Sequence, residues 1–99
     1  MLHIVNKSPY ENNNLASCLR LAQSGHAVLL IEDGVYAAVA GGAKEPALTE
    51  AASRIKLYAL KPDVEARGMG ERLMPGVTLV DYAGFVGLVA EYPTSHSWL

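Results

Sequence analysis

Five consecutive apolar residues, Ala27–Ile31, constrain the fold of this chain more than any other feature. A strand that is apolar at every position is typical of a parallel sheet, in which both faces are covered. The run ends at the turn signal Glu32-Asp33-Gly34, and the alanine-rich segment Val35–Ala40 predicts a short helix directly after it. In open α/β sheets, ligands and partners usually meet the edge at which strands pass into helices.

The same alternation of strand and helix continues along the whole chain. It predicts right-handed crossovers and a single three-layer α/β/α domain over residues 1–99, with a mostly parallel sheet of four to five strands. The other expected strands are Leu2–Val5, Lys56–Leu60, Val77–Val80 and an edge strand within Ser95–Leu99. The other expected helices are Leu15–Ser24, Ala47–Arg54, Pro62–Arg67 and Tyr82–Glu91.

Two of the expected helices have apolar positions that indicate which side is buried. At 100° per residue, the first helix places five apolar side chains on one arc: Leu15, Cys18, Leu19, Leu21 and Ala22. The last helix presents four for burial: Phe85, Val86, Leu88 and Val89. Asn12-Asn13-Asn14 offers N-cap side chains for the first helix, and Gly68–Gly76 is expected to form a flexible loop.

Charge and composition disfavour several classes of function. The net charge is −2 and the eight Lys and Arg residues are scattered, so direct binding to nucleic acid is not expected. No apolar stretch approaches the length of a membrane span, and Met1–Tyr10 lacks the order of a signal peptide. A single cysteine fits a reducing compartment. Together these features predict a cytoplasmic domain without a membrane segment.

Cys18 is the candidate catalytic residue because sulfur chemistry needs a thiolate. It lies near the start of the first helix, where the helix dipole can lower the pKa of a thiol. It also lies on the apolar arc, and buried free cysteines mostly behave as small hydrophobic residues. Packing is favoured over chemistry, and a persulfide on Cys18 stays open as the alternative.

The remaining polar residues predict no cofactor and no metal. His3, His26 and His96 are far apart in sequence, so a metal site would need three separate elements to converge. Gly68–Leu73 begins like a dinucleotide motif but lacks its third glycine.

The acidic residues at strand ends are candidates for acid–base chemistry, although capping of the following helices is favoured for two of them, Asp33 and Asp81. The four are Glu32, Asp33, Asp63 and Asp81. The tyrosines and Trp98 are either interface anchors or half-buried aromatic residues, and His96 is expected to be an exposed contact residue.

Several segments together resemble the DsrH/TusB family of small sulfur-relay proteins. The resemblance covers nearly the whole chain in the same order, and the set of segments is more specific than any one of them. The matching segments are Met1–His3 with Lys7–Pro9, Leu29–Ala38, Leu57–Leu60 with Asp63, Ala66–Gly68, Val80–Val86, and Ser97-Trp98.

The resemblance implies a DsrE-like α/β fold and a subunit of a three-component heterohexamer, with DsrE/TusD-like and DsrF/TusC-like partners. Such complexes pass persulfide sulfur toward 2-thiouridine at the tRNA wobble position, or serve sulfur trafficking linked to sulfur oxidation. TusA/DsrC-like carriers would be met indirectly. The main sulfur-accepting cysteine belongs to the DsrE/TusD-type subunit, and this chain has none after its third strand. Cys18 matches a cysteine of DsrH-type members, which places the chain closer to DsrH.

Three hypotheses follow from these patterns. The first is a non-catalytic or accessory subunit of a sulfur-relay complex. The second is a stand-alone sulfurtransferase that carries a persulfide on Cys18. The third is a flavodoxin-like nucleotide- or flavin-binding module, which rests on fold analogy alone and lacks a phosphate loop. The Glu32-Asp33-Gly34 turn is expected to be structural, and the alanine-rich helix beyond it is expected to let another subunit approach closely.

Overall fold

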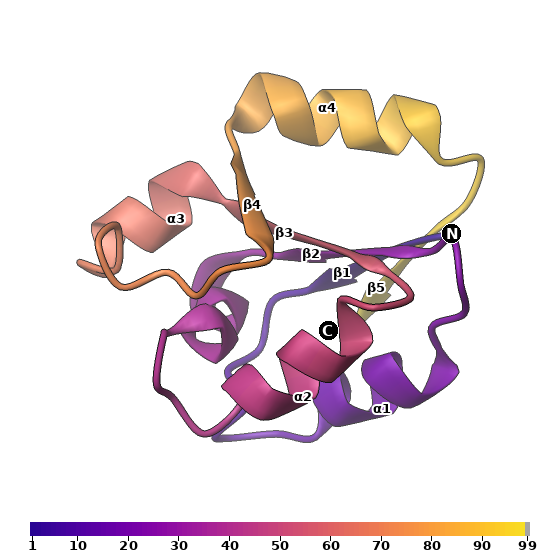
Figure 1. Ribbon diagram of the computed structural model, residues 1–99. Helices are drawn as coiled ribbons and strands as arrows, with labels where there is room; N and C mark the ends of the chain where they lie inside the picture. Colours follow the sequence, from indigo (N-terminus) through magenta and orange to yellow (C-terminus); the bar gives the residue numbers. More distant parts are fainter. Residues whose placement is uncertain (99) are drawn as a thin grey trace.

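The computed structural model describes residues 1–98 and confirms a parallel α/β fold (Figure 1). Its five strands lie in the order β4-β3-β2-β1-β5, and every pair of neighbours is parallel. The strands are β1 Leu2–Val5, β2 Ala27–Leu30, β3 Lys56–Leu60, β4 Val77–Val80 and β5 Ser95–Trp98. The last position of the predicted edge strand, Leu99, lies outside the described residues.

The helices are α1 Asn14–Leu21, the 3₁₀ helix η1 Glu32–Ala38, α2 Glu45–Ala51, α3 Lys61–Ala66 and α4 Tyr82–Glu91. The predicted helix Val35–Ala40 is therefore a 3₁₀ helix that begins and ends earlier. It ends because Val39 adopts an extended backbone and bridges Leu73 in antiparallel fashion. Helix α1 ends before the predicted Ser24 because Ala22 is already extended.

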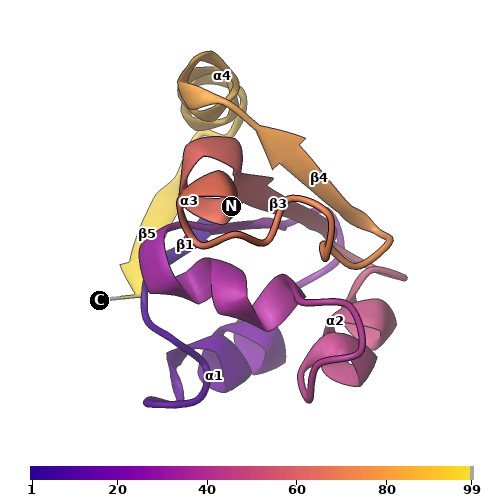
Figure 2. The same ribbon diagram turned by 90° about the vertical axis from the view of Figure 1, so that its left-hand side faces the viewer.

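Strand order decides which face of the sheet each helix covers. The chain passes from β1 to β4 in one direction across the sheet, so right-handed crossovers place α1, η1, α2 and α3 on one face. The connection from β4 to β5 runs back in the opposite direction, and α4 therefore lies on the other face (Figures 1 and 2). Four helices cover one face, and a single helix covers the other.

The core follows this asymmetry. The larger cluster, beneath the four helices, includes Leu15 of α1, Val35 of η1, Leu48 of α2 and Val64 of α3. The smaller cluster has only four buried members, and Leu88 is the one that α4 contributes to it. Around that smaller cluster, the side chains of the sheet are only partly buried; they include Ile4, Ile31, Tyr58 and Val80.

The turn after β2 approaches β1 so closely that it requires glycine. A Cβ at Gly34 would lie 2.3 Å from the carbonyl oxygen of Val5. The absent side chain lets η1 pack directly against the end of β1, and the amide of Gly34 donates to the carbonyl of Ile31 at 2.9 Å. At the Glu32-Asp33-Gly34 turn, the backbone of η1 therefore contacts the backbone at the end of β1.

The loop from Gly68 to Gly76 is anchored, in contrast to the flexible loop that its glycines predicted. Met69 and Met74 are buried in the larger core cluster. The amide of Met74 donates to the carbonyl of Ala38 at 2.8 Å, and the amide of Ala40 donates to Arg72 at 2.6 Å. The two buried methionines anchor the loop in the core, and the two backbone hydrogen bonds join it to the end of η1.

Candidate functional site

Three of the four acidic side chains at the carboxyl edge of the sheet, those of Asp33, Asp63 and Asp81, are engaged in structural contacts. Asp33 accepts hydrogen bonds from Nε and Nη2 of Arg67 at 3.0 and 2.9 Å, and the guanidinium lies 5.8 Å from the centre of the Tyr36 ring. Oδ2 of Asp63 accepts the amide of Glu32 at 2.6 Å. These contacts join η1 to α3.

The predicted cap of η1 is wrong, and the cap of α4 is confirmed. Asp33 lies inside the first turn of η1, so its side chain points outward to Arg67, and Asp63 from α3 satisfies the exposed amide of Glu32 instead. Asp81 precedes α4 and accepts the amide of Gly84 at 2.8 Å. The Asn13 side chain does not cap α1; Oδ1 of Asn12 accepts the amide of Asn14 at 2.7 Å.

Cys18 lies in the interior of the larger core cluster with no exposed surface. Burial raises the pKa of its thiol to about 12, because the thiolate would lose its hydration there. The thiol is therefore protonated at neutral pH, and chemistry at its sulfur would require α1 to move. A role as persulfide carrier stays a prediction.

The three histidines, which are far apart in sequence, lie together at the amino edge of the sheet. Nε2 of His3 lies 3.1 Å from Nδ1 of His26, and His96 is the register partner of His3 across β1 and β5. The indole Nε1 of Trp98 donates to Nδ1 of His3 at 3.2 Å, and His96 meets the Trp98 ring edge-on at 4.9 Å. Over residues 1–98, no group of three side chains has the arrangement of a metal site. The parallel pairing of β5 with β1 creates this cluster, and no local sequence pattern signals it.

Helix α4 carries an apolar surface that the rest of the fold leaves uncovered. Val86 is 68% exposed and Tyr82 and Val89 are also exposed, whereas the sequence predicted burial of both valines. A shallow depression of about 310 Å³ on this surface is lined by Phe85, Val86, Val89 and Ala90. Only one side of a helix can face the sheet, and no other helix or strand of residues 1–98 covers the far side of α4 (Figure 2). We call Tyr82, Phe85, Val86, Val89 and Ala90 the α4 surface. Its composition suits association with another apolar surface.

The alanine-rich helix does not offer the surface expected of it. Ala37 and Ala38 of η1 are buried in the larger core cluster, and Tyr36 is the exposed large residue of this helix. Its small side chains allow η1 to pack closely on the chain's own core. Leu21, predicted to be buried, is 63% exposed because it lies at the end of α1, beyond the edge of that core.

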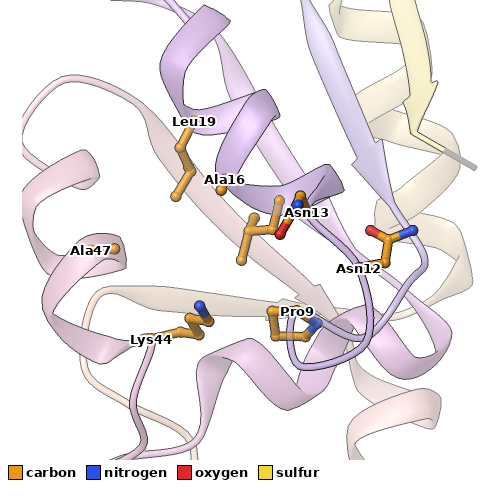
Figure 3. A pocket seen from close by; sticks show the side chains of 8 residues that line it. Pro9, Asn12, Asn13, Ala16, Leu19, Lys44 and Ala47 are labelled. Carbon is orange, nitrogen blue, oxygen red and sulfur yellow. The ribbon is translucent and has the colours of Figure 1, made fainter.

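A small pocket lies between α1 and the start of α2, beside the loop after β1 (Figure 3). Lys44 and Ala47 line one wall, and Asn13, Ala16 and Leu19 line the other. Its volume is about 80 Å³. Sites for small organic ligands typically measure about 300–1,000 Å³, so the pocket is too small for a nucleotide or a flavin. No helix of residues 1–98 is long and apolar enough to cross a membrane.

Comparison with known proteins identifies relatives along the whole chain. Residues 7–95 match the family model described as DsrH like protein. Protein TusB of Pectobacterium parmentieri is 45% identical over 98 residues, which cover 99% of this chain and all of the relative. Protein TusB of Escherichia coli is 39% identical with the same coverage.

Solved structures show the same fold at lower sequence identity. The crystal structure of the ychN protein from E. coli has a TM-score of 0.81 at 21% identity and covers 97% of both chains. A protein of unknown function from Methanobacterium thermoautotrophicum has a TM-score of 0.75 at 20% identity, covering 97% of this chain and 95% of that one. At these identities the likeness concerns the fold alone.

Proposed function

The chain belongs to the DsrH-like family, and from this premise we propose that it is a non-catalytic subunit of a cytoplasmic sulfur-relay complex. Its partners in the proposal are DsrE/TusD-like and DsrF/TusC-like subunits, two copies of each in a heterohexamer. One of these partners carries the persulfide, and TusA/DsrC-like carriers reach the complex through them. The full-length match to relatives named TusB is the observation that supports this proposal most directly.

The uneven covering of the sheet supports assembly with another protein. The face beneath α4 has a small core with partly buried residues around it, and the α4 surface is apolar and exposed. A chain of 99 residues has little free energy to spare for leaving such a surface in water. Association through the α4 surface would bury it.

The chemistry of the chain's own residues favours an accessory role. Cys18 is buried and protonated, and the carboxylates of Asp33, Asp63 and Asp81 at the carboxyl edge are engaged in an ion pair or accept backbone amides. Lys61 directly follows β3 and Asp81 directly follows β4. At these two strand ends the chain turns to opposite faces of the sheet, which is where ligands of open α/β sheets usually bind. Neither residue is a sulfur nucleophile. The reacting sulfur is therefore expected on a partner subunit.

The names of the full-length relatives favour 2-thiolation of the tRNA wobble uridine as the destination of the sulfur. Cys18, which matches DsrH-type members, is the observation in favour of sulfur trafficking linked to sulfur oxidation. Deletion of the gene followed by analysis of tRNA nucleosides distinguishes the two. Loss of 2-thiouridine supports the first destination, and an unchanged 2-thiouridine content excludes it.

Assembly is tested by co-expressing the chain with the proposed DsrE-like and DsrF-like partner subunits of the same organism. The mass of the purified complex is then measured by native mass spectrometry. We expect a hexamer. The variant Val86→Lys is expected to weaken it at least tenfold, because a charge would have to be buried in the α4 surface. Leu21→Lys is the matched control, since Leu21 is equally exposed on the opposite side of the molecule.

A chain that stays monomeric in the presence of both partner subunits would contradict the proposal. Equal effects of Val86→Lys and Leu21→Lys on the complex would be compatible with assembly but would show that the α4 surface is not the interface. Circular dichroism of each variant establishes that both are folded.

The alternative activity is a single transfer at Cys18. Its thiolate would attack the terminal sulfur of a donor persulfide, forming a persulfide on Cys18 and releasing the donor thiolate. Mass spectrometry after incubation with such a donor measures the gain of one sulfur atom, and Cys18→Ala is the control. We expect no adduct on the folded chain, and an adduct that Cys18→Ala abolishes would favour the alternative.

A further inference from the structure

A chain of hydrogen bonds connects the edge strand β5 through β1 to the turn before β2. The indole N–H of Trp98 is a donor only, so Nδ1 of His3, at 3.2 Å, must accept. A neutral imidazole then carries its proton on Nε2, which donates to Nδ1 of His26 at 3.1 Å. Nδ1 of His26 also lies 3.2 Å from the amide of Gln23, another group that only donates. A single pair of tautomers gives each of the three contacts a donor and an acceptor, with Nδ1 of His26 accepting from both His3 and the amide of Gln23.

We propose that His3 is a pH-sensitive latch that holds β5 on the sheet. Protonation of His3 adds a proton at Nδ1, so that the imidazolium N–H and the indole N–H of Trp98 face each other as two donors. The hydrogen bond is then lost and replaced by repulsion. The strand that carries Trp98 is released from the sheet at acidic pH and held there at neutral pH.

The surroundings of His3 keep it neutral in the folded protein. Its side chain is almost completely buried in the sheet. Burial lowers the pKa of His3, and His26, His96 and the amino group of Met1 lower it further. From α1 and the turn after it, Leu21 and Gln23 line the same depression, and neither side chain titrates. The charges near His3 are therefore potential cations, so protonation of one histidine disfavours protonation of the next.

Apart from the Trp98 side chain, β5 is held mainly by its pairing with β1. It is a four-residue edge strand that pairs with β1 alone, and residues 95–97 are exposed. Trp98 is the hydrophobic residue of β5, and it packs against the larger core cluster. Release of β5 would leave the outer edge of β1 unpaired and open to another strand. The latch thus controls access to the edge of the sheet, independently of the proposed sulfur-relay role.

Trp98 is the only tryptophan of the chain, so its signals report on the latch directly. We would lower the pH of the folded chain from about pH 8 to about pH 5. Indole emission and the solvent exchange of the indole N–H in ¹⁵N NMR spectra follow Trp98, with free N-acetyltryptophanamide as the reference at each pH. We expect emission at longer wavelength at low pH. Relative to the reference at the same pH, indole exchange should accelerate by up to about tenfold for each pH unit below the pKa of His3. The amides of β2 should stay protected, which shows that the sheet is intact.

Two variants separate the role of His3 from that of His96. His3→Asn places an amide oxygen near the position of Nδ1, which accepts the indole N–H and does not titrate; we expect the transition to vanish. His96→Gln removes the other histidine beside the Trp98 ring, and we expect the transition to remain. If His3→Asn fails to fold, Trp98→Phe replaces it: without the indole donor, the pKa of His3 in an NMR titration should rise.

A transition that survives in His3→Asn, or that disappears in His96→Gln, would overturn the proposal. So would indole exchange that does not change with pH relative to the reference. An unchanged pKa of His3 in Trp98→Phe would show that the indole does not hold His3 in its neutral form.

Discussion

At the scale of single residues, burial decides what Cys18 can do. At neutral pH a thiol with a pKa of about 12 is ionised in only about one molecule in 10⁵. We predict that Cys18 of the folded chain reacts with a disulfide reagent such as DTNB at least a hundredfold more slowly than the same thiol in denaturant. Absorbance of the released thiolate measures both rates. Comparable rates would show that α1 opens readily and would restore Cys18 as a reactive site.

A second prediction for a single residue concerns Gly34, and it rests on steric overlap. In Gly34→Ala the new Cβ would overlap the carbonyl oxygen of Val5, a backbone atom that cannot turn aside. We expect unfolding free energy to fall by about 3 kcal/mol or more, measured by urea denaturation. Gly87→Ala in α4 is the control, since a Cβ there meets nothing within 4 Å. It is expected to stabilise the helix by about 0.5–1 kcal/mol. A neutral Gly34→Ala would mean that η1 shifts away from β1 at little cost.

At the scale of elements, a hydrogen bond that the preceding residue, Asp81, accepts from the Gly84 amide caps the start of α4. Asp81→Ala removes the acceptor of the Gly84 amide, and we predict a loss of about 1 kcal/mol in thermal unfolding. Asp81→Asn, which keeps an acceptor oxygen, should retain most of the stability. Equal losses in the two variants would indicate that the negative charge, and not the cap, matters.

The ion pair between Asp33 and Arg67 joins two elements, η1 and α3. Because the Asp33 carboxylate is 57% exposed, solvent screens the pair. A double-mutant cycle with Asp33→Ala and Arg67→Ala should give a coupling of about 0.5 kcal/mol that shrinks at about 1 M salt. We further expect Asp33→Ala to affect stability or assembly before sulfur transfer. A complex that assembles normally with this variant but transfers no sulfur would assign Asp33 to the chemistry.

At the scale of the whole molecule, His3 and His26 link stability to pH. Burial is the first cause that lowers the pKa of each below the ordinary 6.5, and nearby cations add to it. The unfolded chain then binds more protons than the folded chain as the pH falls below 6.5. The stabilising contribution of the neutral histidines is fully present above that pH. It is lost as the pH falls from 6.5 toward the lower folded-state values.

Urea denaturation between about pH 7.5 and about pH 5 measures this dependence. We expect the free energy of unfolding to fall with acidity in the wild type and to fall less in the double variant His3→Asn, His26→Gln. Parallel curves for the two chains would show that carboxylates elsewhere govern the acid response.

Sequence alone determined the elements of this protein and their parallel pairing. The apolar run at Ala27–Ile31, the turn signals after it and the Asp81 cap are local patterns, and local backbone preferences are sufficient to interpret them. The family resemblance, too, was visible in short segments along the chain. These predictions held because each depends on residues close together in sequence.

Tertiary structure alone decided which residues meet and which stay exposed. The strand order places α4 by itself on one face, so Val86 and Val89 remain exposed although their pattern predicts burial. The same order places β5 beside β1 and brings His96 and Trp98 to His3 from the far end of the chain. Asp33 pairs with Arg67 because α3 folds back over η1. Such contacts arise from the path of the chain across the sheet, which no local window of sequence contains.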